Sequence, residues 1–207
     1  MALVKYNNNS ISSLTSAASF PAGALTLIKT LTASSSANLS FVHGSSDVVL
    51  DSTYPIYLFK FINMHPATDN VTFQFQTSTN SGSSYGVTCT STAFRSLHDE
   101  DDSSATLDYT TGNDLAQSTN FKQIMGGLGA DNDQSGSGIL HLFDPSSTTF
   151  VKHFILRSQT AHRSDRTVDM LHAGYFNTTS AIDAVQFKMS SGNIDAGTIK
   201  LYGLKDS

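Results

Sequence analysis

Four consecutive acidic residues at positions 99–102, directly after His98, form the densest group of charge in the chain. Carboxylate oxygens on a flexible loop are the ligands that hard cations prefer. A charge run of this kind is more commonly a solvated surface that keeps a protein soluble. We therefore expect Asp99, Glu100, Asp101 and Asp102 to lie on an exposed loop, and we assign no metal to them.

A second acidic segment, residues 131–138, begins like a calcium loop, with oxygen-bearing side chains at its first, third and fifth positions. The twelfth position of such a loop carries a bidentate Glu. Here that position is Leu142, which falls inside a predicted strand. The glycines near the end of the segment instead indicate a turn that leads into this strand, so no calcium site is predicted.

The histidines, serines and acids do not form a recognisable catalytic or metal-binding pattern. Zinc sites need closely spaced pairs of ligands, whereas the seven histidines are dispersed. His141 and His153 fall on neighbouring predicted strands, where a structural pair explains them as well as a ligand pair does. The chain has no Gly-x-Ser-x-Gly nucleophile elbow. The glycine-rich segment 126–129 lacks the Lys-Ser/Thr that a phosphate-binding loop requires. We predict a protein that is not an enzyme and that holds no cofactor and no metal.

Tyrosines are the remaining side chains suited to recognition, because their rings stack on sugars while Asn and Asp side chains supply hydrogen bonds. Trp is absent, and the thirteen Phe residues are more simply the core of a large β domain. If the chain binds a glycan, we expect the recognition loop to be the polar stretch 99–137. Its contact residues would be the acids at 99–102 together with Tyr109, since binding residues gather on loops held by a rigid scaffold.

The composition indicates an all-β protein. Ser (31 residues) and Thr (23 residues) supply about a quarter of the 207 positions, and only 14% of the residues are charged. Thr suits a pleated surface, and Ser suits turns. The net charge of −5 argues against a nucleic-acid binder, and no apolar run reaches the length of a membrane span. A single cysteine, Cys89, excludes an internal disulfide, which is typical of folding in a reducing compartment.

Alternating apolar and polar residues predict about ten strands in one domain, residues 23–207, after a polar N-terminal arm, residues 1–22, that ends at Phe20 and Pro21. The predicted strands lie near 24–31, 38–42, 56–62, 71–76, 85–98, 139–143, 150–157, 168–177, 182–189 and 198–204. A loose apolar stripe predicts a short helix within 113–125. This pattern favours an antiparallel two-sheet sandwich of jelly-roll type. The arm is too polar to fold alone, so we expect it to become ordered on a neighbouring subunit.

Several strand and turn segments resemble a family of virion structural proteins from tailed phages of marine bacteria, particularly cyanobacteria and other oceanic hosts. They lie at 54–59, 63–69, 73–78, 82–85, 138–147, 150–154 and 181–204, and together they span most of residues 24–204. The resemblance implies a non-enzymatic particle component with a jelly-roll-like sandwich, assembled in many copies. It transfers no functional residues, because these motifs are signatures of strands and turns.

Two main functions remain open. The first is a capsid decoration or cement-like protein on the exterior of the phage head, bound to the major capsid protein or other virion proteins, with the 1–22 arm docked on an adjacent subunit. The second is a tail or fibre module that binds a host-surface glycan, and a hydrolytic depolymerase is a third, weaker hypothesis. In each case we expect a symmetric homo-oligomer, for which a trimer is one arrangement. We expect no nucleic-acid partner, no membrane insertion, and a virion location after synthesis in the host cytoplasm.

Overall fold

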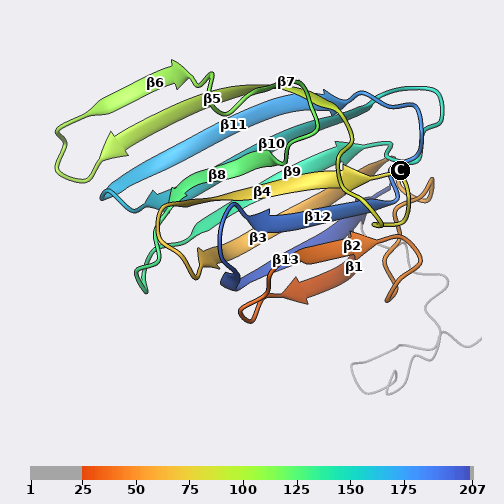
Figure 1. The fold of residues 1–207 in the computed structure, drawn as a ribbon, viewed down its shortest axis with the longest axis horizontal. Helices are drawn as coiled ribbons and strands as arrows, with labels where there is room; N and C mark the ends of the chain where they lie inside the picture. The colour runs from red at the N-terminus through yellow and green to blue at the C-terminus, as the bar shows by residue number, and fades with distance from the viewer. Residues whose placement is uncertain (1–24, 206–207) are drawn as a thin grey trace, which may run out of the picture.

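The computed structural model describes residues 25–205, which form thirteen β-strands and no helix (Figure 1). The strands are β1 (Leu25–Thr32), β2 (Leu39–Val42), β3 (Ile56–Pro66), β4 (Val71–Ser78), β5 (Cys89–Asp99), β6 (Ala105–Tyr109), β7 (Leu115–Ser118), β8 (Lys122–Leu128), β9 (Gly136–Phe143), β10 (Lys152–His162), β11 (Arg166–Phe176), β12 (Ala184–Met189) and β13 (Ile194–Leu204). The prediction of an all-β protein is confirmed. The predicted arm, including Phe20 and Pro21, lies outside the described residues.

The structure differs from the sequence prediction in two details of the stretch 99–137, and its strands belong to one continuous sheet where two sheets were predicted. The stretch 99–137 is not one long polar loop, because it contributes β6, β7 and β8 and so raises the number of strands above ten. The predicted helix within 113–125 is wrong. Leu115 begins β7, which pairs with β5, whereas Ile124 lies in β8, which pairs with β4. The apolar residues of the expected stripe therefore belong to two strands and their connection, not to one helix face.

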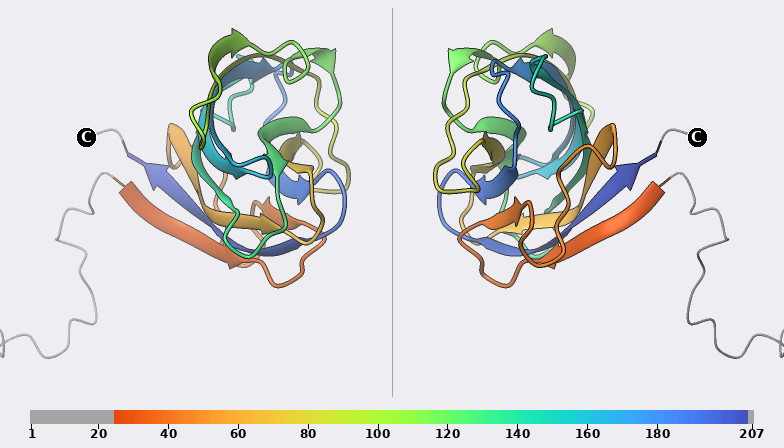
Figure 2. Two further views of the ribbon diagram at one scale, coloured as in Figure 1. Left: turned by 90° about the vertical axis from the view of Figure 1, so that its left-hand side faces the viewer. Right: turned by 90° about the vertical axis from the view of Figure 1, so that its right-hand side faces the viewer.

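All strand pairs are antiparallel and belong to one continuous sheet. Strands β1, β13, β3, β9, β10, β11 and β5 follow one another in this order, and β6 and β7 both pair with β5. Strands β8, β4, β12 and β2 form a shorter run, which joins the long run where His162 of β10 pairs with Leu128 of β8. The sheet curls upon itself, so that the short run covers part of the inner face of the long run (Figure 2).

Alternation along the strands determines which side chains face inward. In β10 the side chains of Phe154, Leu156, Ser158 and Thr160 are buried, and the residues between them are exposed. β10 pairs with β11 along its whole length, from Lys152 opposite Phe176 to His162 opposite Arg166. Inward-facing positions on one strand are therefore continued by inward-facing positions on the next.

The largest part of the core is aromatic and centres on Phe187 of β12. The rings of five other phenylalanines lie 5.3–6.2 Å from it, centroid to centroid; they are Phe41, Phe59, Phe61, Phe73 and Phe75. Each such pair contributes roughly 0.5–1.5 kcal/mol beyond the burial of its area. Because Phe59 and Phe61 come from β3 and Phe187 from β12, these contacts hold the short run of strands against the long run.

Candidate functional site

A pocket of about 250 Å³ lies between β8 and the curled end of the long run formed by β5 and β11. Its basic side chains are Arg95, His162 and Arg166, and its apolar side chains are Leu97, Val168 and Met170. Two amide side chains, those of Asn113 and Gln123, complete the polar lining together with Thr72. The pocket therefore combines positive charge, hydrogen-bonding groups and an apolar wall.

The register between β5 and β11 places both arginines at this pocket. Arg95 lies opposite Met170, and Arg166 lies opposite Asp99. Arg95 is held by Asp108 of β6, with distances of 3.2 Å from Nε to Oδ1 and 3.1 Å from Nη2 to Oδ2. Nε of Arg166 lies 3.0 Å from Oδ1 of Asp99 in an ion pair, but neither atom makes a hydrogen bond within residues 25–205. Each guanidinium thus lies against a carboxylate of a neighbouring strand, and that of Arg95 is fixed by two hydrogen bonds.

These two ion pairs leave donors free on both guanidinium groups. Asp108 contacts Nε and Nη2 of Arg95, and Asp99 contacts Nε of Arg166. Nη1 of Arg95 and both Nη atoms of Arg166 make no hydrogen bond to any residue in 25–205. The two side chains are 35% and 31% exposed, respectively, so these donors remain accessible.

His162 lies beside these arginines as a neutral ring. Its Nδ1 accepts a hydrogen bond from the backbone N–H of Ser164 at 3.1 Å, which leaves the proton on Nε2. Its pKa is lowered from the usual 6.5, first by burial and then by the positive charges of Arg166, Arg163 and Arg95. Asp69 is the carboxylate that acts on this pKa in the opposite direction.

Two glycines of β8 form one wall of the pocket. A Cβ atom at Gly127 would lie 1.9 Å from Nε2 of His162, and a Cβ atom at Gly126 would lie 2.5 Å from Nε2 of Gln123. Gly127 also has a φ of +62°, in the left-handed region that glycine adopts without strain. These residues are the glycine-rich segment that stood out in the sequence. Their role here is to let two polar side chains approach the backbone.

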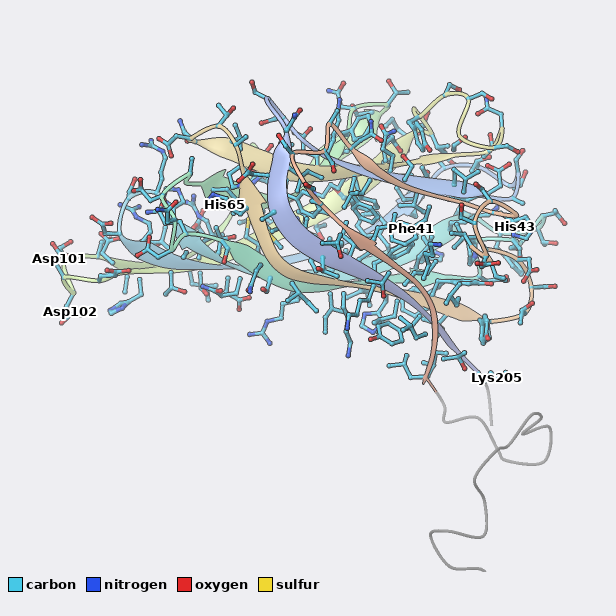
Figure 3. All side chains as sticks on the ribbon, turned by 90° about the horizontal axis from the view of Figure 1, so that it is seen from below. Phe41, His43, His65, Asp101, Asp102 and Lys205 are labelled. Carbon is cyan, nitrogen blue, oxygen red and sulfur yellow. The ribbon has the colours of Figure 1, made fainter. Side chains whose placement is uncertain are left out.

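Glu100, Asp101 and Asp102 lie at the exposed turn between β5 and β6, at one end of the molecule, where Figure 3 labels Asp101 and Asp102. The prediction of an exposed loop is wrong for Asp99, which is the last residue of β5 and has a side chain that is only 13% exposed. Asp99 points back toward Arg166, and Asp102 lies 3.0 Å from Nε2 of His98. Asp101 accepts a hydrogen bond from the backbone N–H of Ser103, and hydrogen bonding by Ser103, from its side chain first and then from its backbone, lowers the pKa of Asp101. Glu100 has no side-chain partner among the described residues. Asp99 is thus the acid that contributes to the pocket.

Tyr109 lies at the opposite end of β6 from the acidic turn. Its hydroxyl donates a hydrogen bond to Asp114 at 2.7 Å, and its ring packs edge-on against Phe94, 5.4 Å away. The hydrogen bond to the Asp114 carboxylate raises the pKa of the tyrosine hydroxyl. The acids at 99–102 and Tyr109 therefore do not converge on a single site within one subunit.

A buried polar cluster lies next to this region and was not anticipated from the sequence. Lys122 of β8 is fully buried and donates a hydrogen bond to the backbone carbonyl of Asn113. Burial lowers its pKa to about 8, and burial raises the pKa of the Cys89 thiol to about 12. The nearest sequence signal is the spacing of Lys122 and Ile124, which places the lysine at an inward position of a strand.

His172 of β11 belongs to the same buried cluster. Burial is the main reason that its pKa falls to about 3, and the charge of Lys122 adds to the effect. Backbone groups of Ile124 and Thr92 lie near the ring, but within the described part of the chain neither ring nitrogen completes a hydrogen bond. His172 is therefore neutral, and it carries an unusual cost of burying polar atoms without partners.

The outward face of the long run carries a row of side chains in register across six strands. Adjacent strands place Lys60, Ile139, Arg157, Leu171, Phe94 and Tyr109 side by side, and we call these six residues the outer row. Its four apolar or aromatic members are 37–49% exposed. Ile155 (48%) and Leu107 (79%) extend the apolar surface on the same strands. Within the outer row, Leu171, Phe94 and Tyr109 are adjacent, and Arg157 separates them from Ile139. Exposed apolar side chains grouped in this way are typical of contact surfaces.

Residues 25–205 contain no group of three or more His, Cys, Asp or Glu side chains arranged to hold a metal ion. In the same residues, no helix is long and apolar enough to cross a membrane. Comparisons of the chain with protein-family models, with curated proteins and with solved structures gave no match.

Proposed function

We propose that this chain is a non-enzymatic structural component of a phage particle, and specifically a decoration or cement-like protein on the exterior of the head. The observation that carries this proposal is the outer row. It presents four exposed apolar or aromatic side chains in register on one face of the sheet, three of them on the neighbouring strands β11, β5 and β6. Such a face is suited to many repeated contacts with capsid subunits or with other copies of the chain. The resemblance to virion structural proteins supports the same role.

We also propose that the curled sheet is a variant of the jelly-roll sandwich. Strands β8, β4, β12 and β2 act as one layer and pack through aromatic rings against strands such as β3 of the other layer. The hydrogen-bonded link between the two layers is short: the ladder pair His162–Leu128, the bond from the Ser158 hydroxyl to the Ile124 carbonyl at 2.7 Å, and the bond from the Arg163 backbone N–H to the Gly127 carbonyl at 3.0 Å. A sandwich of long antiparallel strands suits a mechanical role, because continuous hydrogen-bonded ladders hold the residues of its outward face in register.

The position of the protein on the intact particle tests this proposal. Cryo-electron microscopy of the particle, with gold-labelled antibody as an independent marker, should place it on the head lattice. A Leu171→Asp variant should fold but fail to join particles, because a charge would be buried in the contact. Thr111→Asp adds the same charge at an exposed turn outside the outer row and is the matched control. Density confined to the tail would contradict a head decoration.

A tail or fibre module that binds host-surface glycan is the second candidate, and the pocket between β8 and β11 favours it. A cavity with free guanidinium donors, amide groups and an apolar wall is the kind of site that recognises a small polar ligand. A mechanical decoration has no need of such a cavity. Tail density, together with binding to the host envelope, would favour this function over the first.

A further inference from the structure

We infer that the pocket between β8 and the strands β5 and β11 binds the carboxylate-bearing ring of an acidic monosaccharide, such as a uronic acid residue of a glycan. This inference rests on the glycan-recognition candidate, not on the decoration role, and it names the ligand class for that candidate. It is carried by the arrangement of charge, donors, apolar surface and volume within the one pocket.

The first step is the sign of the charge. Arg95 and Arg166 line the pocket directly, and Arg163 lies close enough to His162 to influence its titration. The carboxylates that hold Arg95 and Arg166 lie on the Nε sides of the guanidinium groups. The Nη donors without protein partners are left for a ligand, and guanidinium groups match the planar geometry of a carboxylate.

The second step is preorganisation. Arg95 is held at two atoms by Asp108, which is itself held by the Thr110 hydroxyl at 3.2 Å. Arg166 lies in an ion pair with Asp99, at 3.0 Å and without a hydrogen bond between Nε and Oδ1. Ordering a long side chain on binding normally weakens affinity. Because Arg95 is already fixed by two hydrogen bonds, a ligand that reaches it loses little affinity in this way.

The third step concerns the rest of the ligand. Leu97, Val168 and Met170 form an apolar wall, and the Gln123 amide has a weak partner, the Met170 sulfur at 3.9 Å. A sugar ring has an apolar face and hydroxyl groups around its edge, which suit such a wall and such an amide. The cavity of about 250 Å³ is of a size to hold one monosaccharide. A bare inorganic anion would use the arginines and leave the wall and the amide without partners.

A ¹⁵N-NMR titration of the full 207-residue chain with D-galacturonate tests this inference. A single sugar ring of this size is expected to bind with a Kd of about 1 mM. The amide signals of Gly126 and Gly127 should shift, because these residues line the pocket. D-galactose has the same ring without the carboxylate and should bind at least tenfold more weakly. Sulfate should also bind at least tenfold more weakly, since it uses only the arginines.

Two variants of different kinds locate the binding. Gly126→Leu fills the pocket and keeps every charge; the backbone at Gly126 is not in the left-handed region, and the atom in its way is the end of the flexible Gln123 side chain. Arg166→Gln removes a guanidinium. Each should weaken galacturonate binding about tenfold or more. Arg157→Gln, which breaks a comparable ion pair with Asp169 on the outward face, is the matched control and should bind as the unaltered chain does.

The absence of pocket shifts at ten times the expected Kd would overturn the inference, as would unchanged binding in both variants if thermal melts show that they are folded. Equal binding of galactose would overturn the role of the carboxylate, and equal binding of sulfate would overturn the assignment to a sugar. The titration uses the purified chain, so its failure is independent of where the protein lies on the particle. A head location with intact galacturonate binding would contradict only the tail function.

Discussion

The region around Phe187 and the region between β8 and β11 fill the interior of one sheet in opposite ways. Around Phe187, rings from β2, β3, β4 and β12 are in contact with one another, and their side chains are fully buried or nearly so. Between β8 and β11, ion pairs and two glycines leave a cavity of about 250 Å³. The first region supplies stability through packing, whereas the second keeps polar groups in place without filling the space between them.

The largest expected effect comes from the aromatic region. Phe187→Ala removes a fully buried ring that contacts five others, and we expect the free energy of unfolding to fall by about 3–5 kcal/mol. Urea denaturation followed by circular dichroism measures this loss. Phe150→Ala is the matched control, because Phe150 is 70% exposed and its removal should change the free energy by less than about 0.5 kcal/mol. Similar losses in the two variants would contradict a packed core centred on Phe187.

The second effect tests the close approach at the pocket wall. Gly127→Ala would place an alanine at a φ of +62° and a methyl group against the His162 ring, so we expect a loss of about 2–3 kcal/mol in the free energy of unfolding. Gly44→Ala shares the left-handed backbone, with a φ of +76°, but has no heavy atom within 4 Å, and it should lose only about 1 kcal/mol. Equal losses would mean that His162 does not lie against Gly127.

A third effect is the pH dependence that His172 produces. Its pKa is about 3 in the folded chain and near 6.5 when unfolded, so the unfolded state binds more protons between these values. The free energy of unfolding therefore decreases as the pH falls below 6.5, by about 2 kcal/mol between pH 8 and pH 5 from this residue. Denaturation curves at both pH values measure the decrease. In His172→Leu the decrease should be smaller by this amount, and an unchanged decrease would contradict a neutral buried ring.

These two regions also differ in how far they could be predicted from the sequence. The period-two alternation in β4, with Phe73 and Phe75 on one face, predicted both the strand and its contribution to the core. Hydrophobic periodicity is a local pattern, so it can be read from one segment of the sequence without knowledge of the partner strand. The pocket depends instead on pairs such as Arg166 with Asp99, which lie on different strands and meet only through the register of β5 and β11.

The helix prediction within 113–125 is wrong for the same reason, which is that pairing between strands cannot be read from a local sequence pattern. Leu115, Phe121 and Ile124 have a spacing that fits a helix face about as well as it fits two short strands. Pairing with β5 and β4 decides between these alternatives, and that pairing is not visible in the segment itself. The Gly126-Gly127 pair could be recognised in the sequence. The glycines alone, however, do not indicate which side chains approach the backbone there. Local pattern thus predicts elements, whereas register decides which charged residues meet.

The smallest expected effect tests whether the Arg95–Asp108 ion pair positions the Arg95 guanidinium or stabilises the fold. Arg95 and Arg157 each contact an aspartate through Nε and Nη2, at distances of 2.9–3.2 Å, one in the pocket and the other on the outward face. Ion pairs with this much solvent exposure contribute little, so Arg95→Gln should lower the free energy of unfolding by only about 0.5 kcal/mol, and Arg157→Gln should leave it unchanged within error. Paired thermal melts and urea curves of the two variants measure this.

A loss of several kcal/mol in Arg95→Gln alone would mean that the Arg95–Asp108 pair belongs to the core, and the contrast between a packed and a polar interior would then be wrong. If both losses are small and only Arg95→Gln weakens galacturonate binding, Asp108 positions a cation for a ligand and contributes little to the stability of the sheet.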